Sequence, residues 1–386
     1  MLTVRGRHYR TSKLCSFHLV DGRVEKVTDP GRAGRVLGGD DYWIAPGLVD
    51  IQVNGYQGHD FLSGETTAED VVAVAMSLAN AGVTAFCPTV TTNSYAAMEV
   101  GLRAIARACD SSDVARERIV GVHLEGPYIC RDDGPRGAHP ASFVHDPDWD
   151  EFTRLQDASG QRIRIVTLAP ELPGAVEFIE KAVRAGIIVA LGHHAATRGQ
   201  INAAVSAGAV LSTHLGNGSH SQLPRHPNYI WEQLAHDGLM ASMIVDGHHL
   251  PSAVVKSFYR VKGPGRLILI SDAIWLAGLN EGLYQLMGQD VELTADRSVR
   301  LAGTSYLAGS TLRLCDAVRN VIDFAGASFS DAILMAAVNP AHLLGIEGAG
   351  TFLEAGARAD LAVFCSAERQ FELAFTIAGG EICYEA

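Results

Sequence analysis

Residues 163–194 read IRIVTLAPELPGAVEFIEKAVRAGIIVALGHH, and this pattern decides the fold class. Two short apolar runs, Ile163–Leu168 and Ile187–Leu191, flank a segment of helical periodicity, Gly174–Ala185, which ends in an Ala-Gly pair typical of a helix C-terminus. A buried strand, a helix and a second buried strand make up the unit from which parallel sheets are built. The stretch therefore predicts a βα repeat.

The same alternation extends from residue 48 to about residue 271, and eight strands can be counted in it. Eight is the strand number of a closed α/β barrel. We therefore predict an α/β fold with a (β/α)8 TIM-like barrel over residues 47–349. The predicted strands are Leu48–Val53, Gly82–Pro88, Arg118–Leu124, Ile163–Leu168, Ile187–Leu191, Ala209–Thr213, Ala241–Val245 and Arg266–Ser271, and further helices are expected at Thr67–Asn80, Tyr95–Ala108, Gln200–Ala207, Pro251–Arg260, Thr311–Phe324 and Asp331–Ala337.

The two ends of the chain have a different pattern from the middle. Residues 1–46 and 350–386 contain short alternating runs such as GRVEKV and ADLAVF, separated by turn residues. We expect them to pair into one small β-sandwich domain. The alternating run VELTADRSVRL within Glu281–Ala302 also predicts a β-hairpin, inserted after the eighth strand and close to the active face.

Composition excludes several classes of partner. The chain has 386 residues and a formal net charge of −12, which argues against nucleic acid or an anionic membrane as the principal partner. A small anionic substrate stays open, because one local group of donors can bind it. The seven cysteines are scattered without a CxxC pair, residues 1–10 lack the apolar run of a signal peptide, and no run of about 20 apolar residues occurs. We expect a cytoplasmic protein.

Polar residues recur where the predicted strands end. In a (β/α)8 barrel the active site is built from the C-terminal ends of the strands, so these side chains should converge on one rim. A single polar strand end would mean little, but here six strands have one. The residues are Gln52 and Asn54, His123 and Glu125, His193, His214, Asp246, and Asp272.

Glu125, His193 and His214 make up a carboxylate and two imidazoles, the ligand type of a catalytic zinc-class ion with one position left for water. For each residue alone, a hydrogen-bonded structural role is the stronger explanation. Together, on three strands of one rim, they favour a metal site. We predict one divalent ion per subunit, zinc, with Fe2+, Mn2+ and Co2+ as alternatives.

Asp272 closes the last strand, where an acid can face the metal and act as a general base on water. The alternative for Asp272 is the N-cap of a following helix. His139, in the loop GPRGAHP, could bond a substrate carbonyl, although a lone loop histidine is more often a solvated surface group.

Two further groups suit a phosphate. Asn217 and Gly218 lie in HLGNGSH, followed by Arg225 in LPRHPN, and His249 lies in VDGHHL. An amide, an accessible backbone N–H and a planar guanidinium can all be directed at one anion. The alternative, a glycine-rich loop with an exposed arginine, stays open from the loop alone.

Taken together, the motifs resemble those of the N-acetylglucosamine-6-phosphate deacetylase family of the amidohydrolase superfamily, over nearly the whole chain. The resemblance rests on APGLVDIQVNG, AGVTAFCPTVTT, GVHLEGPY, RGAH, VTLAPE, GHHAAT, THLGN, VDGHH, SDA, LAGST and NPAHLLG, in the family's order. It implies metal-dependent hydrolysis of the N-acetyl group of N-acetylglucosamine 6-phosphate, giving glucosamine 6-phosphate and acetate.

The resemblance also implies roles for residues. Glu125, His193 and His214 would ligate the metal, Asp272 would be the catalytic acid/base, and His139 would polarise the acetyl carbonyl. Members of the family are homodimers in which the histidine that matches His249 reaches the partner's site, so the resemblance implies a homodimer here. Gln52 and Asn54 stand where superfamily relatives bind a second metal and are poor ligands for a zinc-class ion, so one metal is expected. The implied substrate-binding residues are Ala138, His139, Asn217, Gly218, Arg225, His249, Leu307, Ala308 and Gly309.

Some residues depart from the family pattern. Trp275 and Leu276 follow Asp272 where small residues and proline are usual. His194 and the run of Gly218, Ser219 and His220 are also unusual. The hexosamine epimer therefore stays open, as does another N-acyl amino sugar, phosphorylated or not. A non-catalytic sugar-phosphate-binding protein is the alternative from another class, and the presence of all three ligands and Asp272 argues against it.

Overall fold

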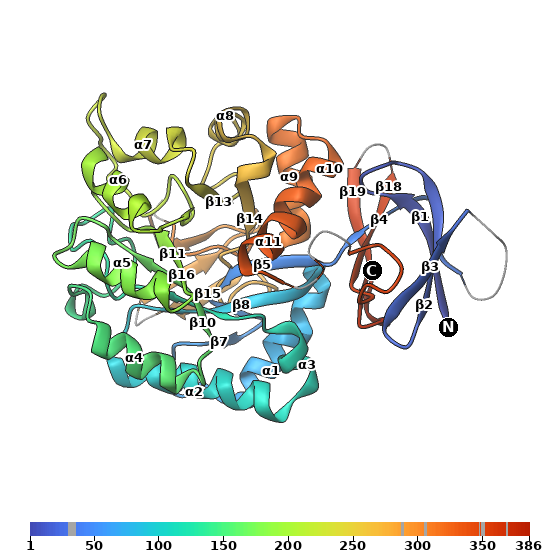
Figure 1. The fold of residues 1–386 in the computed structure, drawn as a ribbon, viewed down its shortest axis with the longest axis horizontal. Helices are drawn as coiled ribbons and strands as arrows, with labels where there is room; N and C mark the ends of the chain where they lie inside the picture. Colours follow the sequence, from blue (N-terminus) through green and yellow to red (C-terminus); the bar gives the residue numbers. More distant parts are fainter. Residues whose placement is uncertain (30–35, 287–288, 305–306, 347, 349–351, 368–369) are drawn as a thin grey trace.

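The computed structural model describes residues 1–29, 36–286, 289–304, 307–346, 348, 352–367 and 370–386. Eight parallel strands pair in the order β14-β13-β12-β11-β10-β9-β8-β5. A bridge between Val53 and Ala273 brings the first and last of them together, so the predicted (β/α)8 barrel is confirmed (Figure 1). The strands are β5 (Leu48–Val53), β8 (Val83–Thr91), β9 (Val122–Glu125), β10 (Ile163–Leu168), β11 (Ile188–Leu191), β12 (Leu211–Ser212), β13 (Met240–Ile244) and β14 (Leu267–Ile270).

Helices surround the strands because their apolar faces cover the sheet. In the helix that follows β10, Phe178, Ile179 and Ala182 are buried while charged residues face outward. None of the described helices is long and apolar enough to cross a membrane. The helices are α1 (Ala68–Ser77), α2 (Tyr95–Ser111), α3 (Asp113–Arg118), α4 (Trp149–Ala158), α5 (Ala175–Arg184), α6 (Arg198–Ser206), α7 (Tyr229–Ala235), α8 (Ser252–Lys262), α9 (Leu314–Ala325), α10 (Phe329–Ile333) and α11 (Asn339–Leu344), with short turns η1 (Leu78–Ala81), η2 (Ala141–Phe143), η3 (Pro264–Arg266) and η4 (Leu334–Val338).

The third predicted strand begins too early. Arg118 ends helix α3, and strand β9 starts only at Val122. The Ser112 side chain caps this helix by accepting from the Ala115 backbone N–H, and the Arg118 guanidinium donates to the carbonyl of Ala75. These contacts hold the segment as a helix although its end reads as an apolar run.

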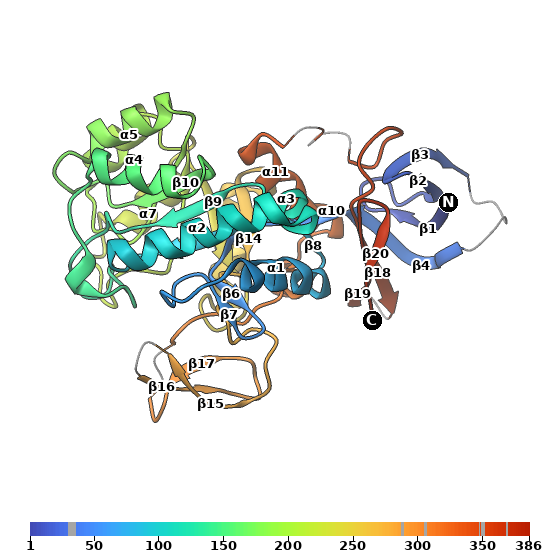
Figure 2. The ribbon, with the colours of Figure 1, turned by 90° about the horizontal axis from the view of Figure 1, so that it is seen from below.

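The terminal segments form one seven-stranded sheet, ordered β20-β19-β18-β4-β1-β2-β3. Strand β4 pairs in parallel with β1 and antiparallel with β18, so it joins the two ends of the chain. The predicted small β-domain is confirmed, and both termini lie in it (Figure 2). The predicted boundary at residues 349 and 350 lies outside the described residues. The strands are β1 (Leu2–His8), β2 (Leu14–Val20), β3 (Arg23–Thr28), β4 (Val36–Pro46), β18 (Leu361–Ala367), β19 (Gln370–Ala378) and β20 (Glu381–Glu385).

The predicted hairpin after the eighth strand is a three-stranded antiparallel sheet of β15 (Gly282–Leu286), β16 (Gln289–Leu293) and β17 (Val299–Leu301). It has a core of its own, made by Leu276, Val291, Leu293 and Val299. Figure 2 shows it projecting from the barrel on the side where the small hairpin β6 (Gly55–Tyr56) and β7 (His59–Asp60) lies. This sheet is therefore placed to cover one end of the barrel.

Candidate active site

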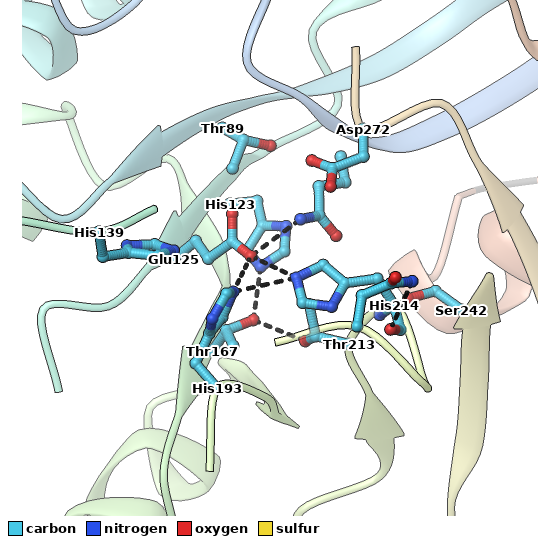
Figure 3. Close-up of polar contacts among 12 residues, drawn as sticks. Thr89, His123, Glu125, His139, Thr167, His193, Thr213, His214, Ser242 and Asp272 are labelled. Atoms are coloured by element: carbon cyan, nitrogen blue, oxygen red, sulfur yellow. Dashed lines mark hydrogen bonds and ion pairs between the residues drawn. The ribbon is translucent and has the colours of Figure 1, made fainter. Parts of the chain in front are cut away.

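Three buried side chains meet at the C-terminal ends of neighbouring strands. Glu125 ends β9, while His193 and His214 each lie two residues beyond the ends of β11 and β12. The Glu125 Oε1 atom lies 3.1 Å from His193 Nε2 and 2.9 Å from His214 Nε2, and the two Nε2 atoms are 3.0 Å apart. The three side chains point toward one another in Figure 3. Among the described residues they are the group suited to hold a metal ion.

The hydrogen-bond partners of this cluster fit a cation. His193 Nδ1 donates to the carbonyl of Pro135 at 2.9 Å, which places the hydrogen on Nδ1 and leaves Nε2 of the neutral ring with a lone pair. That lone pair faces Glu125 Oε1, which is also an acceptor. Two facing acceptors need a positive charge between them, and a divalent ion on a carboxylate and two imidazoles supplies it.

The site residues have strained backbones. His193, His214 and Asp272 have φ angles of 51°, 28° and 49°, in the left-handed region that residues with a side chain rarely adopt. Such conformations cost about 1–3 kcal/mol each and gather at functional sites. Each of the three left-handed residues lies two residues after the end of its strand, where the change in backbone direction turns the side chain toward the rim of the barrel.

Close packing holds the His193 ring in place. Gly218 has a φ of +55°, and a Cβ atom at this position would lie 2.8 Å from His193 Nδ1. A side chain here would both strain the backbone and push the imidazole ring. The loop that the sequence predicts as a phosphate site therefore also packs against the ligand ring.

Asp272 lies at the seam where β14 meets β5. Its Oδ1 atom accepts from Asn54 Nδ2 at 2.6 Å, and its backbone N–H donates to the carbonyl of Gln52 at 3.0 Å. Burial, followed by the charge of Glu125, raises the pKa of Asp272 to about 6. A carboxyl with such a pKa can take up and release a proton near neutral pH.

His139 is buried in the loop after β9, against the ligand cluster. Its ring centroid lies 4.3 Å from that of His193, and burial, followed by the charge of His193, lowers its pKa to about 3. His139 is therefore neutral at pH 7. Thr92 Oγ1 lies 2.8 Å from His139 Nδ1 but 3.4 Å from the Glu125 carbonyl. The Thr92 hydroxyl therefore donates to Nδ1, which accepts through its lone pair. This tautomer carries its hydrogen on Nε2, where it can be donated.

A cavity of about 690 Å³ opens above the cluster. Glu125, His193 and His214 form part of its wall together with Asp272. Apolar lining comes from Ile244, Leu62 and Trp275, and no lysine or arginine lines the cavity within the described residues. The predicted substrate residues that line it are Ala138, His139, Asn217, Gly218, His249, Leu307, Ala308 and Gly309.

Arg225 and His249 are placed differently. Arg225 is exposed on its loop and does not line the cavity of its own chain. His249 does line that cavity, and its Nδ1 bonds Asp246 Oδ2 at 2.6 Å. Although burial alone would raise the pKa of Asp246, hydrogen bonds and charge from His249 lower it. His249 thus lies in the cavity wall of its own chain, and that it reaches a neighbouring site stays a prediction.

Several residues of the site have no role assigned from the sequence. Thr92 orients His139, and Asp246 orients His249. His123, at a predicted strand end, lies inside the barrel, where it bonds the Ile51 carbonyl and Thr167. In the sequence, the one signal for a role of Thr92, Asp246 and His123 is their position at the end of a strand. Asp60, Ser63, Thr91, Asn93 and Gln285 also line the cavity.

The unusual residues divide into two groups. Trp275 lines the cavity and packs edge-on against Tyr284, with ring centroids 5.8 Å apart. His194 is buried against the Tyr229 ring, and His220 lies 3.0 Å from the Tyr229 hydroxyl. Neither of these histidines lines the cavity. Of the departures from the family pattern, Trp275 and Gly218 thus line the cavity.

Comparison with known proteins agrees with this geometry. Residues 43–383 match the model of the amidohydrolase family. The chain is 35% identical over 373 residues to the human N-acetylglucosamine-6-phosphate deacetylase, covering 94% of this chain and 87% of that protein. It is also 33% identical over 319 residues to an N-acetylgalactosamine-6-phosphate deacetylase of Escherichia coli O157:H7, covering 82% of each.

A solved structure is similar over the whole length. It is a variant of the N-acetyl-D-glucosamine-6-phosphate deacetylase from Mycobacterium smegmatis in complex with N-acetyl-D-glucosamine-6-phosphate. The TM-score is 0.88 at 30% sequence identity, and the match covers 99% of both chains. Both the barrel and the terminal sheet are therefore shared with a protein that binds this sugar phosphate.

Proposed function

Since the chain belongs to the N-acetylglucosamine-6-phosphate deacetylase family of the amidohydrolases, we propose that it removes the acetyl group from N-acetylglucosamine 6-phosphate. The products are glucosamine 6-phosphate and acetate. The observation that carries the proposal is the buried group of Glu125, His193 and His214 at the floor of a cavity that Asp272 also lines. This arrangement supplies both a metal site and a proton carrier at one place.

The ligands are proposed to hold one divalent ion, and zinc suits two imidazoles and a carboxylate best. When bound, such an ion activates water and polarises the acyl oxygen. Relatives of the superfamily bind a second metal at the end of the first strand, and here carboxamides stand at that place, in Gln52 and Asn54. Carboxamides are weak ligands for zinc, which supports a single ion.

In the proposed mechanism, two side chains of the protein transfer protons and stabilise charge. Asp272, ionised above its pKa of about 6, takes a proton from the attacking water. His139, neutral and with its hydrogen on Nε2, donates to the acyl oxygen as negative charge develops there. Asp272 finally delivers its proton to the departing nitrogen, so that the amine leaves and acetate remains.

The phosphate is proposed to bind at Asn217, Gly218 and His249. The three lie in the cavity wall, and the imidazole of His249 is oriented by the hydrogen bond between its Nδ1 and Asp246 Oδ2. The backbone of Ala138 and of residues 307–309 is proposed to contact the sugar. Arg225 is proposed to act on the phosphate of a neighbouring subunit in a homodimer, because it is exposed and outside its own cavity.

The galactosamine epimer is a second candidate substrate. It is favoured by the 33% identity to the N-acetylgalactosamine-6-phosphate deacetylase, which is close to the 35% identity to the human N-acetylglucosamine-6-phosphate deacetylase. The Trp275 segment lies in the cavity wall, where it can distinguish the two epimers.

A cytoplasmic location stays a proposal as well. The same holds for the division of the chain into a barrel of residues 47–349 and a small domain made of the two ends.

The test is acetate release by the purified, zinc-loaded protein. N-acetylglucosamine 6-phosphate is compared with the unphosphorylated sugar and with the galactosamine and mannosamine 6-phosphates. We expect the glucosamine phosphate to react fastest and the unphosphorylated sugar to react poorly. A faster galactosamine phosphate would correct the epimer, while no acetate release from any of them by metal-loaded protein would overturn the proposal.

A further inference from the structure

The first barrel strand places two carboxamides beside the two catalytic carboxylates. Gln52 and Asn54 are two residues apart at the end of β5, so their side chains leave the strand on the same side. Gln52 Nε2 donates to Glu125 Oε1 at 3.0 Å. Asn54 Nδ2 donates to Asp272 Oδ1 at 2.6 Å and lies 3.4 Å from the Asp272 carbonyl. Each carboxamide thus meets a different carboxylate.

The backbone around these contacts fixes the carboxamides. The Asn54 N–H donates to the Ala273 carbonyl at 2.8 Å, and the Asp272 N–H donates to the Gln52 carbonyl at 3.0 Å. These bonds close the barrel at the seam between β5 and β14. Gln52 is itself buried. The two side chains therefore have few alternative positions, and a donor held in place orients its acceptor.

From this geometry we propose that Gln52 and Asn54 are positioning residues: Gln52 holds the ligand carboxylate of Glu125, and Asn54 holds the acid/base carboxylate of Asp272. The inference rests on the roles given to Glu125 and Asp272 in the proposed function. The end of the first strand then does not retain an unused second-metal position. It provides hydrogen-bond donors to the two anionic groups of a one-metal site.

Such a role has a physical reason. Glu125 is buried and Asp272 is half-buried, and their negative charges oppose each other, as the raised pKa of Asp272 indicates. A second cation would offset this repulsion where one is bound. Here the two amide N–H groups offset part of it, and they also fix the direction in which each carboxylate oxygen points.

Asn54 is tested by two substitutions. Asn54→Leu removes the donor at similar size, and Asn54→Asp keeps the shape but faces Asp272 with a second carboxylate. In both variants we expect kcat to fall by roughly 10- to 100-fold, KM to stay within about twofold, and one zinc per chain to be retained. A kcat within twofold of wild type in both variants would overturn the role of Asn54.

Gln52 is tested through the metal. In Gln52→Leu the Glu125 carboxylate loses its donor, and we expect the zinc dissociation constant, measured by chelator competition, to rise roughly tenfold. An unchanged dissociation constant would overturn the role of Gln52. This measurement does not need turnover. It therefore stands even if the wild type fails to release acetate, an outcome that would remove the proposed function alone.

Asn339→Leu is the matched control. Asn339 is also a buried carboxamide, but its Nδ2 donates to the carbonyls of Pro264 and Leu267, at the opposite end of β14. The control should lower Tm while leaving kcat and the zinc dissociation constant close to wild type. If Asn339→Leu lowers kcat and zinc affinity as much as the Asn54 and Gln52 variants do, the effect comes from general loss of structure and the proposal is wrong.

Discussion

Asp272 combines a half-buried position, a left-handed backbone and a nearby negative charge, and a substitution can separate its chemistry from its shape. Asn has nearly the same shape but cannot carry the proton. We expect Asp272→Asn to bind one metal ion per chain and to lose roughly 100- to 10,000-fold in kcat, the range of general acid–base catalysis. Metal analysis and acetate release measure the two effects. Turnover near the wild-type rate would remove Asp272 from the mechanism.

The same carboxyl sets the acidic limb of the activity profile. Asp272 acts first as a base and must be ionised, and burial and the charge of Glu125 raise its pKa to about 6. Activity should therefore fall as the pH falls through about 6. A bound divalent ion offsets the charge of Glu125, so the limb in the loaded enzyme is expected at or below this value. A profile of kcat/KM from pH 4.5 to pH 8 checks it, and a limb above pH 7 would contradict it.

Thr92 controls which nitrogen of His139 carries hydrogen. Thr92→Val keeps the volume and removes the hydroxyl that faces His139 Nδ1 at 2.8 Å. We expect kcat to fall about tenfold, as for one lost hydrogen bond, with the metal content unchanged. Thr376→Val is the control. Thr376 lies in the terminal domain, and its hydroxyl is also buried but donates to the Ala79 carbonyl. Equal losses of kcat in both variants would exclude this role.

At the scale of residues, the sequence predicted which side chains meet at the site, but it did not predict the contacts that they make there. Glu125, His193, His214 and Asp272 could be selected because strand ends of a barrel converge, whatever the loops do. Arg225 lies on an exposed loop, where no such rule fixes the direction of a side chain. The donors Gln52 and Asn54 were read as poor metal ligands, since only coordinates reveal which carboxylate each amide meets.

At the scale of elements, the segment between β14 and β15 places Trp275 in the cavity wall, where its ring makes an edge-on contact with the Tyr284 ring. A flat apolar ring in this wall suits contact with one face of a sugar. We expect Trp275→Ala to raise KM roughly fivefold, as for the loss of an aromatic contact of about 1 kcal/mol, with a smaller effect on kcat. Initial rates at varied substrate concentration measure both.

The control is Trp231→Ala, because Trp231 is 52% exposed on α7 and does not line the cavity. Binding should also change the fluorescence of the wild type but much less that of Trp275→Phe. An unchanged KM together with an unchanged fluorescence response in the Trp275 variants would exclude contact between this side chain and the sugar.

The elements themselves were predictable to different degrees. Strands β5 and β10 have the predicted bounds, since apolar runs buried on both faces stand out in the sequence. Helices α3, α4 and α7 were not predicted. They are short, at 6, 10 and 7 residues, and depend on caps such as the Asn228 side chain, which accepts from two backbone N–H groups at the start of α7.

For the whole molecule, the barrel followed from counting strands, and the terminal domain followed from its different pattern. What could not be derived is that β4 pairs with both β1 and β18, because the sequence pattern does not show which strands become partners, and β18 follows β4 by more than 300 residues. The chain passes from Pro46, the last residue of β4, through one residue into β5, which starts at Leu48. The terminal sheet is therefore attached directly to the strand that holds Gln52 and Asn54.

Metal binding should stabilise the entire barrel, because its ligands come from three strands that must be paired for the site to exist. A ligand that binds only the folded chain adds about 2.7 kcal/mol at 100 times its dissociation constant, which for a chain of this length raises Tm by roughly 3 °C. We expect chelation to lower Tm by this amount and zinc to restore it. His193→Ala should show neither change. A wild-type Tm that does not respond to chelation, although metal analysis shows that the ion has been removed, would mean that the ion does not prefer the folded chain, and the cluster from three strands would then not be its site.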